Sequence, residues 1–475
     1  MKATFHPHRR RRGSVLVIAL VLAAAIAIAL GSYLQVAKTS LDISHRAYYA
    51  NAATNLAETG LEQAMWSLNA KDWTGGWAPV TGGVMRTFTS ADGIGSYTGN
   101  TTGAVVVRVD NHNPAPGSTP TVYAKSLIKP YRGAPIEKWL RINCGLGSSP
   151  WVGIVAQTMG VSGGAAIFDS YRSKIGGAKV KYMNAIPSGT GINRGANISL
   201  VALSTDADSV DGSNSKIYGY ISVGAEEKVD AVAFHKNAML TGDFDAPPKT
   251  QDLSRITYDA SLSIPRVKQP TGGTAIPNIT SATTLTSGQY TVNKVDLSGA
   301  GSNLTIAPGA KVELYIPTTS TTETVLKVGG NAKIIIPDDA ELVIYTPGDV
   351  SVTGNNVVNT GSATSFGIPR QFVIYGTRSK TIADRQEIVL GGQGEMYAIV
   401  HAPDANITLN GGGSSGHFYG ALVGHHAELN GGANVTWDET LADDTTMRVW
   451  RVAEWIEYTT ATERATIADK FEADD

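Results

Sequence analysis

An uninterrupted apolar run near the N-terminus constrains this chain more than any other feature. Residues 14–31 read SVLVIALVLAAAIAIALG, and the first charged residue after them is Lys38. As an α-helix this run would extend about 27 Å, close to the ~30 Å hydrocarbon core of a bilayer. The run is therefore predicted to cross a membrane.

A cluster of basic residues precedes this run. Lys2 and Arg9–Arg12 are all positively charged, and the whole chain has a formal net charge of −2, so the remainder after Gly13 is acidic. Basic residues beside a membrane span tend to stay cytoplasmic. We therefore expect a single-pass inner-membrane protein with a cytoplasmic N-terminus and an exported remainder, periplasmic or at the cell surface. We interpret the basic residues as a targeting signal and not as a nucleic-acid surface, so no nucleic-acid partner is expected.

The helical pattern continues beyond the apolar run. One apolar stripe, at steps of seven or four, is formed by Leu34, Leu41, Tyr48, Ala52 and Leu56. Such spacing is typical of a helix with one packing face, and Lys38, Asp42 and Arg46 follow at steps of four on another face. We predict one helix over residues 14–69, transmembrane at first and amphipathic afterwards.

Two other interpretations of the N-terminus stay open. An ordinary signal peptide would be removed, and Ala25-Ile26-Ala27 or Ala27-Ile28-Ala29 would supply small-x-small cleavage sites. A plain membrane anchor would keep its whole N-terminus. The run is longer than the usual apolar region of a signal peptide and passes directly into further helix, which favours a retained span.

The N-terminal segment resembles a known family at specific residues. The basic leader over residues 1–13, the Arg12-Gly13 step, the hydrophobic run and the long amphipathic helix are similar to a type IV prepilin. The resemblance implies that a prepilin peptidase cleaves after Gly13. It also implies that Ser14 becomes the first, often N-methylated, residue of the mature chain.

A closer resemblance is to the PilX N-terminal class of minor pilins. It is carried by RRGSVLVIAL and by AYYANAATNLAETGLEQAMWSLN. Within the second string, Ala57, Glu58, Gly60 and Glu62 are similar to the Ala-Glu-Ala-Gly-x-Glu signature of that class. The resemblance implies that other pilin or pseudopilin subunits are partners.

One position departs from the pattern of major pilins. These carry Glu at the fifth mature position, which is Ile18 here. A carboxylate among apolar helices is costly unless it is paired, and in those filaments it is thought to meet a neighbour's N-terminal amine. This chain cannot form that pair, so the resemblance implies a minor or capping subunit rather than a major one.

Residues 70–150 read as a small antiparallel β-rich head. Alternation with a period of two covers residues 104–109, 121–128 and 136–146, between breaks rich in Gly and Pro. A pilin-like head packed on the helix would have this pattern, and a strand-rich spacer would have it too. Cys144 is the one cysteine of the chain, which excludes an intrachain disulfide.

Residues 151–444 read as short strands separated by Gly, Asn, Asp and Ser. One turn-then-strand string recurs at residues 307–314, 337–344 and 402–409. A second string begins at Leu390, Leu409 and Leu429, so its copies lie 19 and 20 residues apart. Coils of that length gain partners only by stacking, which predicts a large parallel β-helix. A β-sandwich is the competing fold.

Two further features complete the predicted architecture. Residues 168–171, 419–424 and 429–433 resemble a Gly-rich domain often fused behind PilX-class N-termini, and that resemblance implies no chemistry. The tail over residues 445–475 is expected to cap the last coil. The predicted fold class is thus α+β, with a long N-terminal helix, a small antiparallel β region and a large parallel β-helix.

The sequence offers weak candidates for chemistry. Asp206, Asp208 and Asp211 depart from a calcium loop because Val210 occupies its third ligand position. The main enrichment of imidazole is His401, His417, His425 and His426, which a coil stack could bring to one metal. No matching carboxylates accompany them, and no nucleophile elbow, phosphate loop or dinucleotide fingerprint occurs. We expect no enzyme, no catalytic residue, no metal and no cofactor.

The predicted function is that of a minor pilin-like structural subunit of a type IV pilus or related secretion system. It would display an exported β-solenoid for structural or adhesive use. The alternative is a membrane-anchored β-helix that binds or cleaves polysaccharide, which makes surface polysaccharide a further candidate partner. A secreted adhesin with an ordinary signal peptide is the third interpretation.

Overall fold

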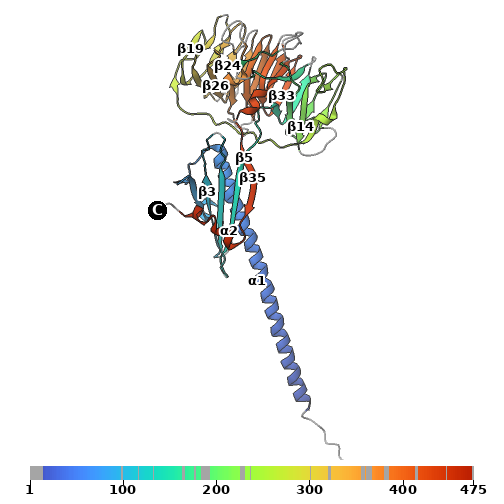
Figure 1. Ribbon diagram of the computed structural model, residues 1–475, viewed down its shortest axis with the longest axis vertical. Helices are drawn as coiled ribbons and strands as arrows, with labels where there is room; N and C mark the ends of the chain where they lie inside the picture. The colour runs from blue at the N-terminus through green and yellow to red at the C-terminus, as the bar shows by residue number, and fades with distance from the viewer. Residues whose placement is uncertain are drawn as a thin grey trace, which may run out of the picture. The chain divides into compact units, whose positions relative to one another are not determined.

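The computed structural model describes most of the chain and divides it into two compact units. The described residues are 14–97, 100–115, 117–131, 133–162, 166–175, 178–182, 193–224, 231–235, 237–299, 301–318, 323–354, 359, 366–378, 385–411, 416–444 and 447–472. The first unit holds the chain up to Leu146 and again Trp450–Asp475, and the second is Gly147–Val449 (Figure 1). The second unit is therefore an insertion into the first. The predicted leader 1–13, with Gly13, lies outside the described residues.

One helix opens the described chain. Helix α1 spans Ser14–Ala70, which confirms the helix predicted over residues 14–69. Within the described residues it is the one helix long and apolar enough to cross a membrane. A membrane anchor and a signal sequence both have these properties.

The first unit contains a six-stranded antiparallel sheet in the order β1-β2-β3-β4-β5-β35. Its strands are β1 (Ala78–Val80), β2 (Gly83–Phe88), β3 (Thr102–Asp110), β4 (Thr121–Lys129), β5 (Ile136–Leu146) and β35 (Trp450–Glu457). Three of them, β3, β4 and β5, contain the three strands expected within residues 70–150. Short helices η1 (Ser90–Asp92), α2 (Ala461–Ala465) and η5 (Ala468–Phe471) complete the unit.

Both faces of this sheet are covered. The C-terminal half of α1 packs on one face, where alternate residues such as Val105, Val107 and Val109 are buried. On the other face Tyr458 and Ile467 of the tail pack with Tyr123 and Trp139. The period-two alternation of the strands thus supplies an apolar row to each face.

The tail differs from the expectation that residues 445–475 cap the last coil. Strand β35 pairs antiparallel with β5, with Trp450 opposite Leu146 and Glu457 opposite Leu140. Residues 450–475 therefore belong to the first unit. The sequence of a single strand does not specify its partner, because pairing depends on a register that only the folded sheet defines.

The second unit is built from parallel sheets, which confirms the β-rich parallel part of the predicted fold. Its strands form a 15-stranded, a nine-stranded and a three-stranded sheet. The first series is β6 (Gly153–Ala156), β7 (Thr158–Ser162), β8 (Ile167–Tyr171), β11 (Ile198–Ala202), β12 (Val210–Asp211), β13 (Lys216–Ile217), β14 (Gly219–Gly224), β15 (Val232–Ala233), β16 (Met239–Leu240) and β17 (Ile256–Ala260). A small antiparallel pair, β9 (Lys174–Ile175) and β10 (Ala178–Lys179), and η2 (Leu253–Arg255) accompany it.

A second series of strands follows a connecting segment. It is β18 (Thr274–Ala275), β19 (Thr283–Leu285), β20 (Gly288–Thr291), β21 (Val295–Leu297), β22 (Leu304–Ile306), β23 (Lys311–Tyr315), β24 (Thr324–Val328), β25 (Ile334–Ile335), β26 (Glu341–Thr346), β27 (Asp349–Thr353), β28 (Phe372–Gly376), β29 (Glu387–Gly392), β30 (Glu395–His401), β31 (Asn406–Gly411), β32 (His417–Val423), β33 (His426–Asn430) and β34 (Asn434–Asp438), with η3 (Pro369–Gln371) and η4 (Glu439–Asp443).

The repeated strings of the sequence lie on neighbouring strands. Leu390 pairs with Leu409, and Leu409 pairs with Leu429, in the nine-stranded sheet. Residues 311–315 and 341–345 likewise pair in register in the 15-stranded sheet, whereas the third copy of that string, at 402–409, enters the other sheet. Repeats 19 or 20 residues apart therefore do correspond to adjacent strands.

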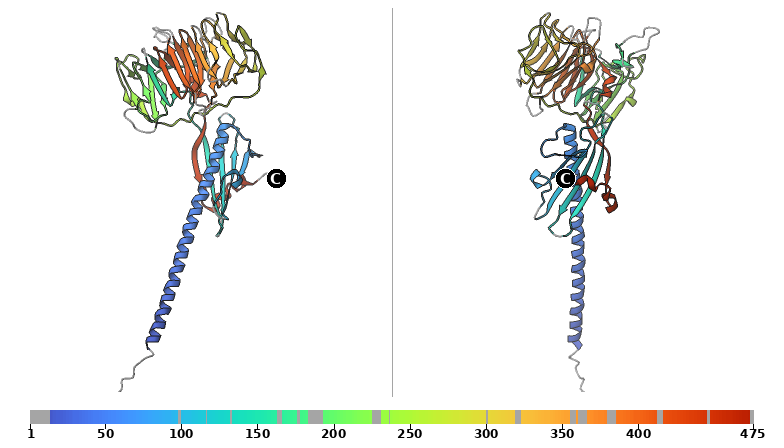
Figure 2. Two further views of the ribbon diagram at one scale, coloured as in Figure 1. Left: turned by 180° about the vertical axis from the view of Figure 1, so that it is seen from behind. Right: turned by 60° about the vertical axis from the view of Figure 1, so that its left-hand side comes forward.

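The spatial order of the strands departs from their chain order. Residues 261–273, the crossing segment, connect β17 to β18 and run along the unit to its far end (Figure 1). From there the second series returns, so that β32, β33 and β34 pair with β6, β7 and β8. Figure 2 shows this order as green, teal, red, orange and yellow strands along the unit. The first and last coils are therefore neighbours.

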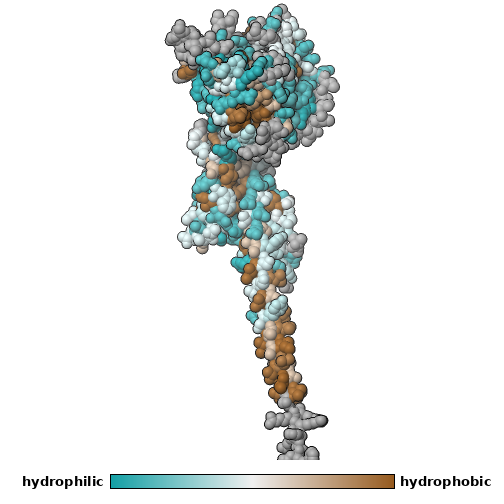
Figure 3. Space-filling view, turned by 90° about the vertical axis from the view of Figure 1, so that its right-hand side faces the viewer, coloured by the Kyte–Doolittle hydropathy of each residue, from teal (hydrophilic) through white to brown (hydrophobic). Residues whose placement is uncertain are grey.

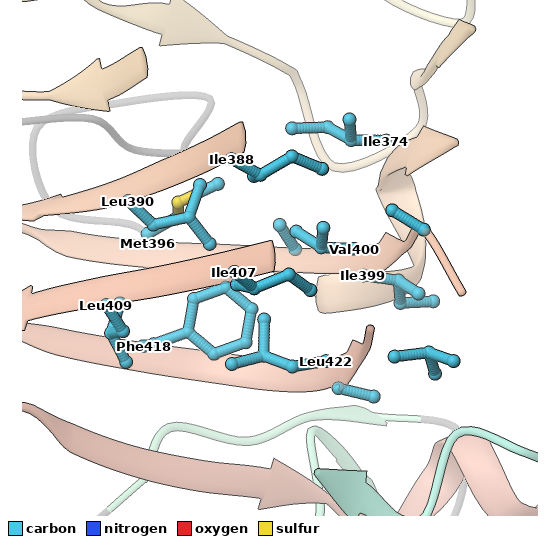
Figure 4. Packing of buried hydrophobic residues seen from close by; sticks show 14 of the residues in the cluster. Ile374, Ile388, Leu390, Met396, Ile399, Val400, Ile407, Leu409, Phe418 and Leu422 are labelled. Carbon is cyan, nitrogen blue, oxygen red and sulfur yellow. The ribbon is translucent and has the colours of Figure 1, made fainter. Parts of the chain in front are cut away.

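The core of the second unit runs through the inside of these sheets. Figure 4 shows its middle, where Ile388 and Ile407 of one sheet face Val400 and Phe418 of another. The inward side chains are mainly branched and apolar, and Phe418 is 1% exposed. Burial of such side chains is worth about 1.5–3 kcal/mol each, so the stack is held mainly by this continuous core.

Candidate functional site

The N-terminal half of α1 is the most unusual surface of the described chain. Its large apolar side chains, from Val15 to Val36, are each more than half exposed. Figure 3 shows them as a continuous brown surface on the projecting helix. An apolar surface of this extent is typical of a membrane or protein contact, because exposing it to water costs free energy along its whole length.

The C-terminal half of the same helix is a packing element. Leu56, Leu61 and Leu68 are buried against the antiparallel sheet. Ser126 Oγ donates a hydrogen bond of 2.6 Å to the carbonyl of Ala53, and Trp77 Nε1 donates one of 3.1 Å to Ser67 Oγ. Of the predicted apolar stripe, Leu34, Leu41 and Tyr48 stay exposed, and Ala52 and Leu56 contact the sheet.

The signature residues Ala57, Glu58, Gly60 and Glu62 separate into two pairs. Ala57 is fully buried, and a Cβ on Gly60 would lie 2.7 Å from a methyl of Val107. These two small residues let the helix approach β3 closely. Glu58 and Glu62 point to solvent. The sequence identified the four positions, and the phase of the helix assigns them to different faces.

The residues expected at the mature N-terminus lie on the exposed half of α1. Ser14 begins the helix. Ile18 is 64% exposed, and its apolar neighbours are exposed to a similar degree. Within the part of the chain that the structure describes, no element packs over Ile18.

A polar network that the sequence analysis missed lies in the second unit. Asp169 is fully buried and accepts hydrogen bonds from Tyr182 Oη at 2.6 Å, Arg194 Nε at 2.6 Å and Thr436 Oγ1 at 2.5 Å. Because Thr436 donates to Asp169, His417 Nε2 donates to Thr436 Oγ1, at 2.7 Å. Asp169, the one charged residue of strand β8, was the available signal.

Aromatic rings extend this network across strands. The Tyr419 ring stacks on His417, with centroids 4.2 Å apart, and on Tyr397, at 4.4 Å. Tyr397, Tyr419, Thr436 and Asp169 are register partners on β30, β32, β34 and β8. The network therefore crosses the junction between the last and the first coil, and its best-supported role is to fix that junction.

Burial controls the protonation of this network. It raises the pKa of Asp169, although the hydrogen bonds from Thr436 and Tyr182 and the charge of Arg194 act in the opposite direction. It lowers the pKa of His417 to about 4. The imidazole is thus neutral at pH 7 and donates through Nε2.

The four histidines singled out in the sequence do not converge. His401 lies at the end of β30 and His417 at the start of β32, where their register partners are Val423 and Glu395. His426 lies in another sheet, where its Nδ1 is 2.9 Å from Thr158 Oγ1, and His425 precedes it. Within the described residues no group of three or more His, Cys, Asp or Glu side chains could hold a metal ion.

His401 instead anchors the crossing segment. It is fully buried, and its Nε2 lies 2.7 Å from the carbonyl of Pro265 while Trp151 Nε1 lies 3.4 Å from its Nδ1. A carbonyl and an indole N–H require a neutral ring with the proton on Nε2. Burial lowers the pKa of His401 to about 4, in agreement with that state.

The acidic cluster is a turn. Asp206 accepts a hydrogen bond of 2.7 Å from Ser204, and Asp211 accepts one of 3.0 Å from the backbone N–H of Ser213. Asp208 has a left-handed backbone with φ of 54°. The hydrogen bonds of Asp206 and Asp211 and the left-handed backbone of Asp208 are those of a turn between strands.

Comparison with known protein families gives a match for part of the chain. Residues 266–444 match a domain family described as a domain of unknown function (DUF7305). The match begins in the crossing segment and ends after η4, so it covers the second series of strands. No curated protein and no solved structure matches the chain.

Proposed function

We propose that this chain is a minor pilin-like structural subunit. The first half of α1 would hold it in the inner membrane, and both folded units would be exported. The observation that carries the proposal is the continuity of α1. A single helix of 57 residues begins as an exposed apolar rod and ends as the packing helix of an antiparallel sheet. Removal of an ordinary signal peptide would cut this helix within its apolar half.

The exported second unit is proposed to be a β-helix-like solenoid. Its strands pair in parallel with strands about one coil away, and the repeats at Leu390, Leu409 and Leu429 stack directly. Each coil obtains its backbone partners from the coils beside it, as in other stacked repeats. Such a stack suits a structural or adhesive role, and no catalytic residue is proposed.

Processing is proposed to follow the resemblance to prepilins. A prepilin peptidase would cleave after Gly13, and Ser14 would become the methylated first residue. Ile18 cannot pair with an amine, so the subunit would enter a filament as a minor or capping member. The apolar half of α1 would then exchange lipid for the helices of neighbouring pilin-like subunits, because both surroundings cover its side chains.

The mass of the mature N-terminus tests this proposal. The protein is purified from washed inner membranes of its native host, and its N-terminal peptide is identified by mass spectrometry. Ser14 as the first residue, carrying one methyl group, is the expected result. Met1 would indicate a plain anchor, and a start near Ile28 or Leu30 would indicate a secreted protein; either outcome refutes the proposal.

A processing variant supplies the matched control. Gly13→Val should block cleavage and leave the leader attached, while both folded units stay intact. The variant should therefore remain in the inner membrane and be absent from sheared surface filaments. Equal recovery of the variant and the natural protein in the filament fraction would contradict the proposed route.

The alternative function is the binding or cleavage of polysaccharide. Ligand sites are often lined by aromatic rings, and Tyr315, Tyr345 and Tyr375 form a row of register partners on the 15-stranded sheet. Tyr315 and Tyr375 are buried, and the rings contact one another. Incubation with acidic polysaccharides, followed by absorbance of unsaturated products, would reveal the cleaving alternative.

A further inference from the structure

An open strand edge lies beside α1 in the first unit. Strand β35 is the terminal strand of the six-stranded sheet, and its other edge has no partner among the described residues. All residues from Arg451 to Trp455 are exposed. Unpaired backbone N–H and C=O groups of such an edge can pair with a strand of another chain.

A β-bulge shapes the side chains of this edge. The register with β5 shifts at Ala453, so that Val452 lies opposite Cys144 and Trp455 opposite Ile142. Cys144 and Ile142 both belong to the core beneath α1. The extra residue therefore places Val452 and Trp455 on the same side as the helix, although they are three positions apart.

These two side chains form an apolar strip at the edge. Val452 is 49% exposed and Trp455 is 45% exposed. Bulges often protect strand edges by twisting them away from partners. Here the bulge gathers apolar side chains on one side, which favours docking over protection.

The signature carboxylates lie along the same edge. Glu58, Glu62, Met65 and Asn69 follow at steps of four, three and four, so they share one stripe of α1. Met65 Sδ is 3.6 Å from Cys144 Sγ in β5, and Asn69 Oδ1 accepts a hydrogen bond of 2.6 Å from the backbone N–H of Trp450. That stripe therefore faces the β5–β35 border, and β35 runs beside α1 (Figure 1).

The levels of these groups along the edge also agree. From the contact between Asn69 and Trp450, five residues of strand reach Trp455, and eleven residues of helix reach Glu58. Both paths are about 16 Å long at their standard rises. Glu58 is thus level with Trp455, and Glu62 lies one helical turn nearer to Val452.

We propose that this edge, with Glu58 and Glu62, receives a β-strand of another exported subunit that carries Lys or Arg on its helix-facing side. The strand would add to β35 by backbone hydrogen bonds, cover Trp455 and Val452, and place its cations beside the two carboxylates. The proposal rests on the proposed function only for the kind of partner, a second subunit of the same assembly.

A second copy of this chain fits the edge less well. Symmetric pairing of two β35 strands would bring both Glu58 and Glu62 pairs to the same side of the joined sheet, where like charges repel. Strand β1, at the opposite edge of the sheet, has only three residues and contains Pro79, which lacks a backbone donor. A different, basic strand is therefore the better occupant.

The opposite side of β35 has its own charges. Glu454 Oε2 is 2.5 Å from Asn143 Nδ2 and 3.7 Å from Arg141. Arg451 also points away from the helix side, since it pairs with Gly145. On the helix side, Glu457 lies opposite Leu140 and is paired with Lys138, so Glu58 and Glu62 are the carboxylates left to select the strand there.

Synthetic strands test this proposal on the full-length protein in detergent. The probe is a labelled eight-residue peptide of alternating Lys and Val, and its binding is measured by fluorescence anisotropy. One control peptide replaces each Lys by Glu, and another replaces two Val residues by Pro, which removes backbone donors while keeping the charge. We expect the Lys-Val peptide to bind at least tenfold more tightly than either control.

Matched variants locate the binding. Trp455→Ser and the pair Glu58→Gln/Glu62→Gln should each weaken binding of the Lys-Val peptide at least fivefold, whereas Leu253→Ser, at an exposed apolar side chain of the second unit, should not. Unchanged thermal melting shows that the variants are folded. Equal binding of the Lys-Val and Pro peptides, or equal binding to all variants, would overturn the proposal.

The outcome is independent of the N-terminal processing. Peptide binding in detergent does not depend on whether the chain begins at Met1 or Ser14. A protein with an unprocessed N-terminus can therefore still pass this test, and a correctly processed one can fail it.

Discussion

The two units are stabilised by different arrangements of neighbouring strands and helices. In the first unit β1 to β5 pair in chain order, α1 covers one face of their sheet, and the C-terminal tail packs on the other. In the second unit many parallel strands enclose a continuous core, and Phe168 of the first coil pairs with Val435 of the last. The first unit therefore depends on the contacts of one helix and one tail. The second depends on many similar contacts and on one junction that closes them.

The largest expected effect removes a core ring from the second unit. Phe418→Ala leaves a cavity between β30, β31 and β32, and such truncations cost about 3–5 kcal/mol of unfolding free energy. Hydrogen exchange measured by mass spectrometry should show loss of protection throughout the second unit and little change in the first. Leu253→Ala, at a side chain that is 64% exposed, is the control and should change neither. Loss of protection confined to β32 would show that the coils do not act together.

The next effect is acid destabilisation through His401. Its pKa is about 4 in the folded protein, because burial disfavours the charged ring, whereas in the unfolded chain it is near the ordinary 6.5. Between these values the unfolded state binds the proton and the folded state does not, so stability falls as the pH is lowered from about 6.5 to 4. The slope is at most about 1.4 kcal/mol per pH unit, or about 3 kcal/mol in all.

A variant isolates this contribution. His401→Gln keeps an amide donor for the carbonyl of Pro265 and does not titrate. In this variant the urea midpoint of the second unit should fall less steeply as the pH is lowered from 7 to 4.5. The same pH dependence in the variant and in the natural protein would assign the acid sensitivity to other groups, such as His417.

A smaller effect is expected at the helix of the first unit. Gly60→Ala would place its methyl 2.7 and 2.9 Å from the side chains of Val107 and Val105. Overpacking of this kind costs about 1–3 kcal/mol. Gly31→Ala is the matched control, because nothing lies within 4 Å of its Cβ position. Urea unfolding of the first unit should separate the two variants, and equal midpoints would show that α1 packs less closely than the structure indicates.

Local periodicity explains which parts of the fold could be predicted. The helix and the strands β3, β4 and β5 each have a pattern that is contained in their own residues. The Leu390, Leu409 and Leu429 repeats predicted neighbouring strands because equivalent residues of successive coils stack. Neither argument contains information about which coil follows which in space.

The order of the coils and the place of the tail depend on contacts distant in sequence. An apolar coil edge can accept any similar coil, and the junction is specified by polar residues such as Asp169 and Thr436, whose pairing the sequence does not show. The partner of β35 was predicted wrongly for the same reason. At the candidate site, the signature positions were found by resemblance, whereas the exposed state of Glu58 and the buried state of Gly60 required the phase of the helix.

The smallest effect tests whether the crossing segment is held by its charges or by its buried contacts. Arg266 Nε and Nη2 donate to the two carboxylate oxygens of Asp404, at 2.6 and 3.1 Å, but the arginine side chain is 57% exposed. Exposed ion pairs contribute about 0–1 kcal/mol, so Arg266→Ala should lower the unfolding free energy of the second unit by less than 1 kcal/mol. The urea midpoint at low and high salt measures it. A loss as large as that of Phe418→Ala would mean that the crossing segment, rather than the core, limits the stability of the stack.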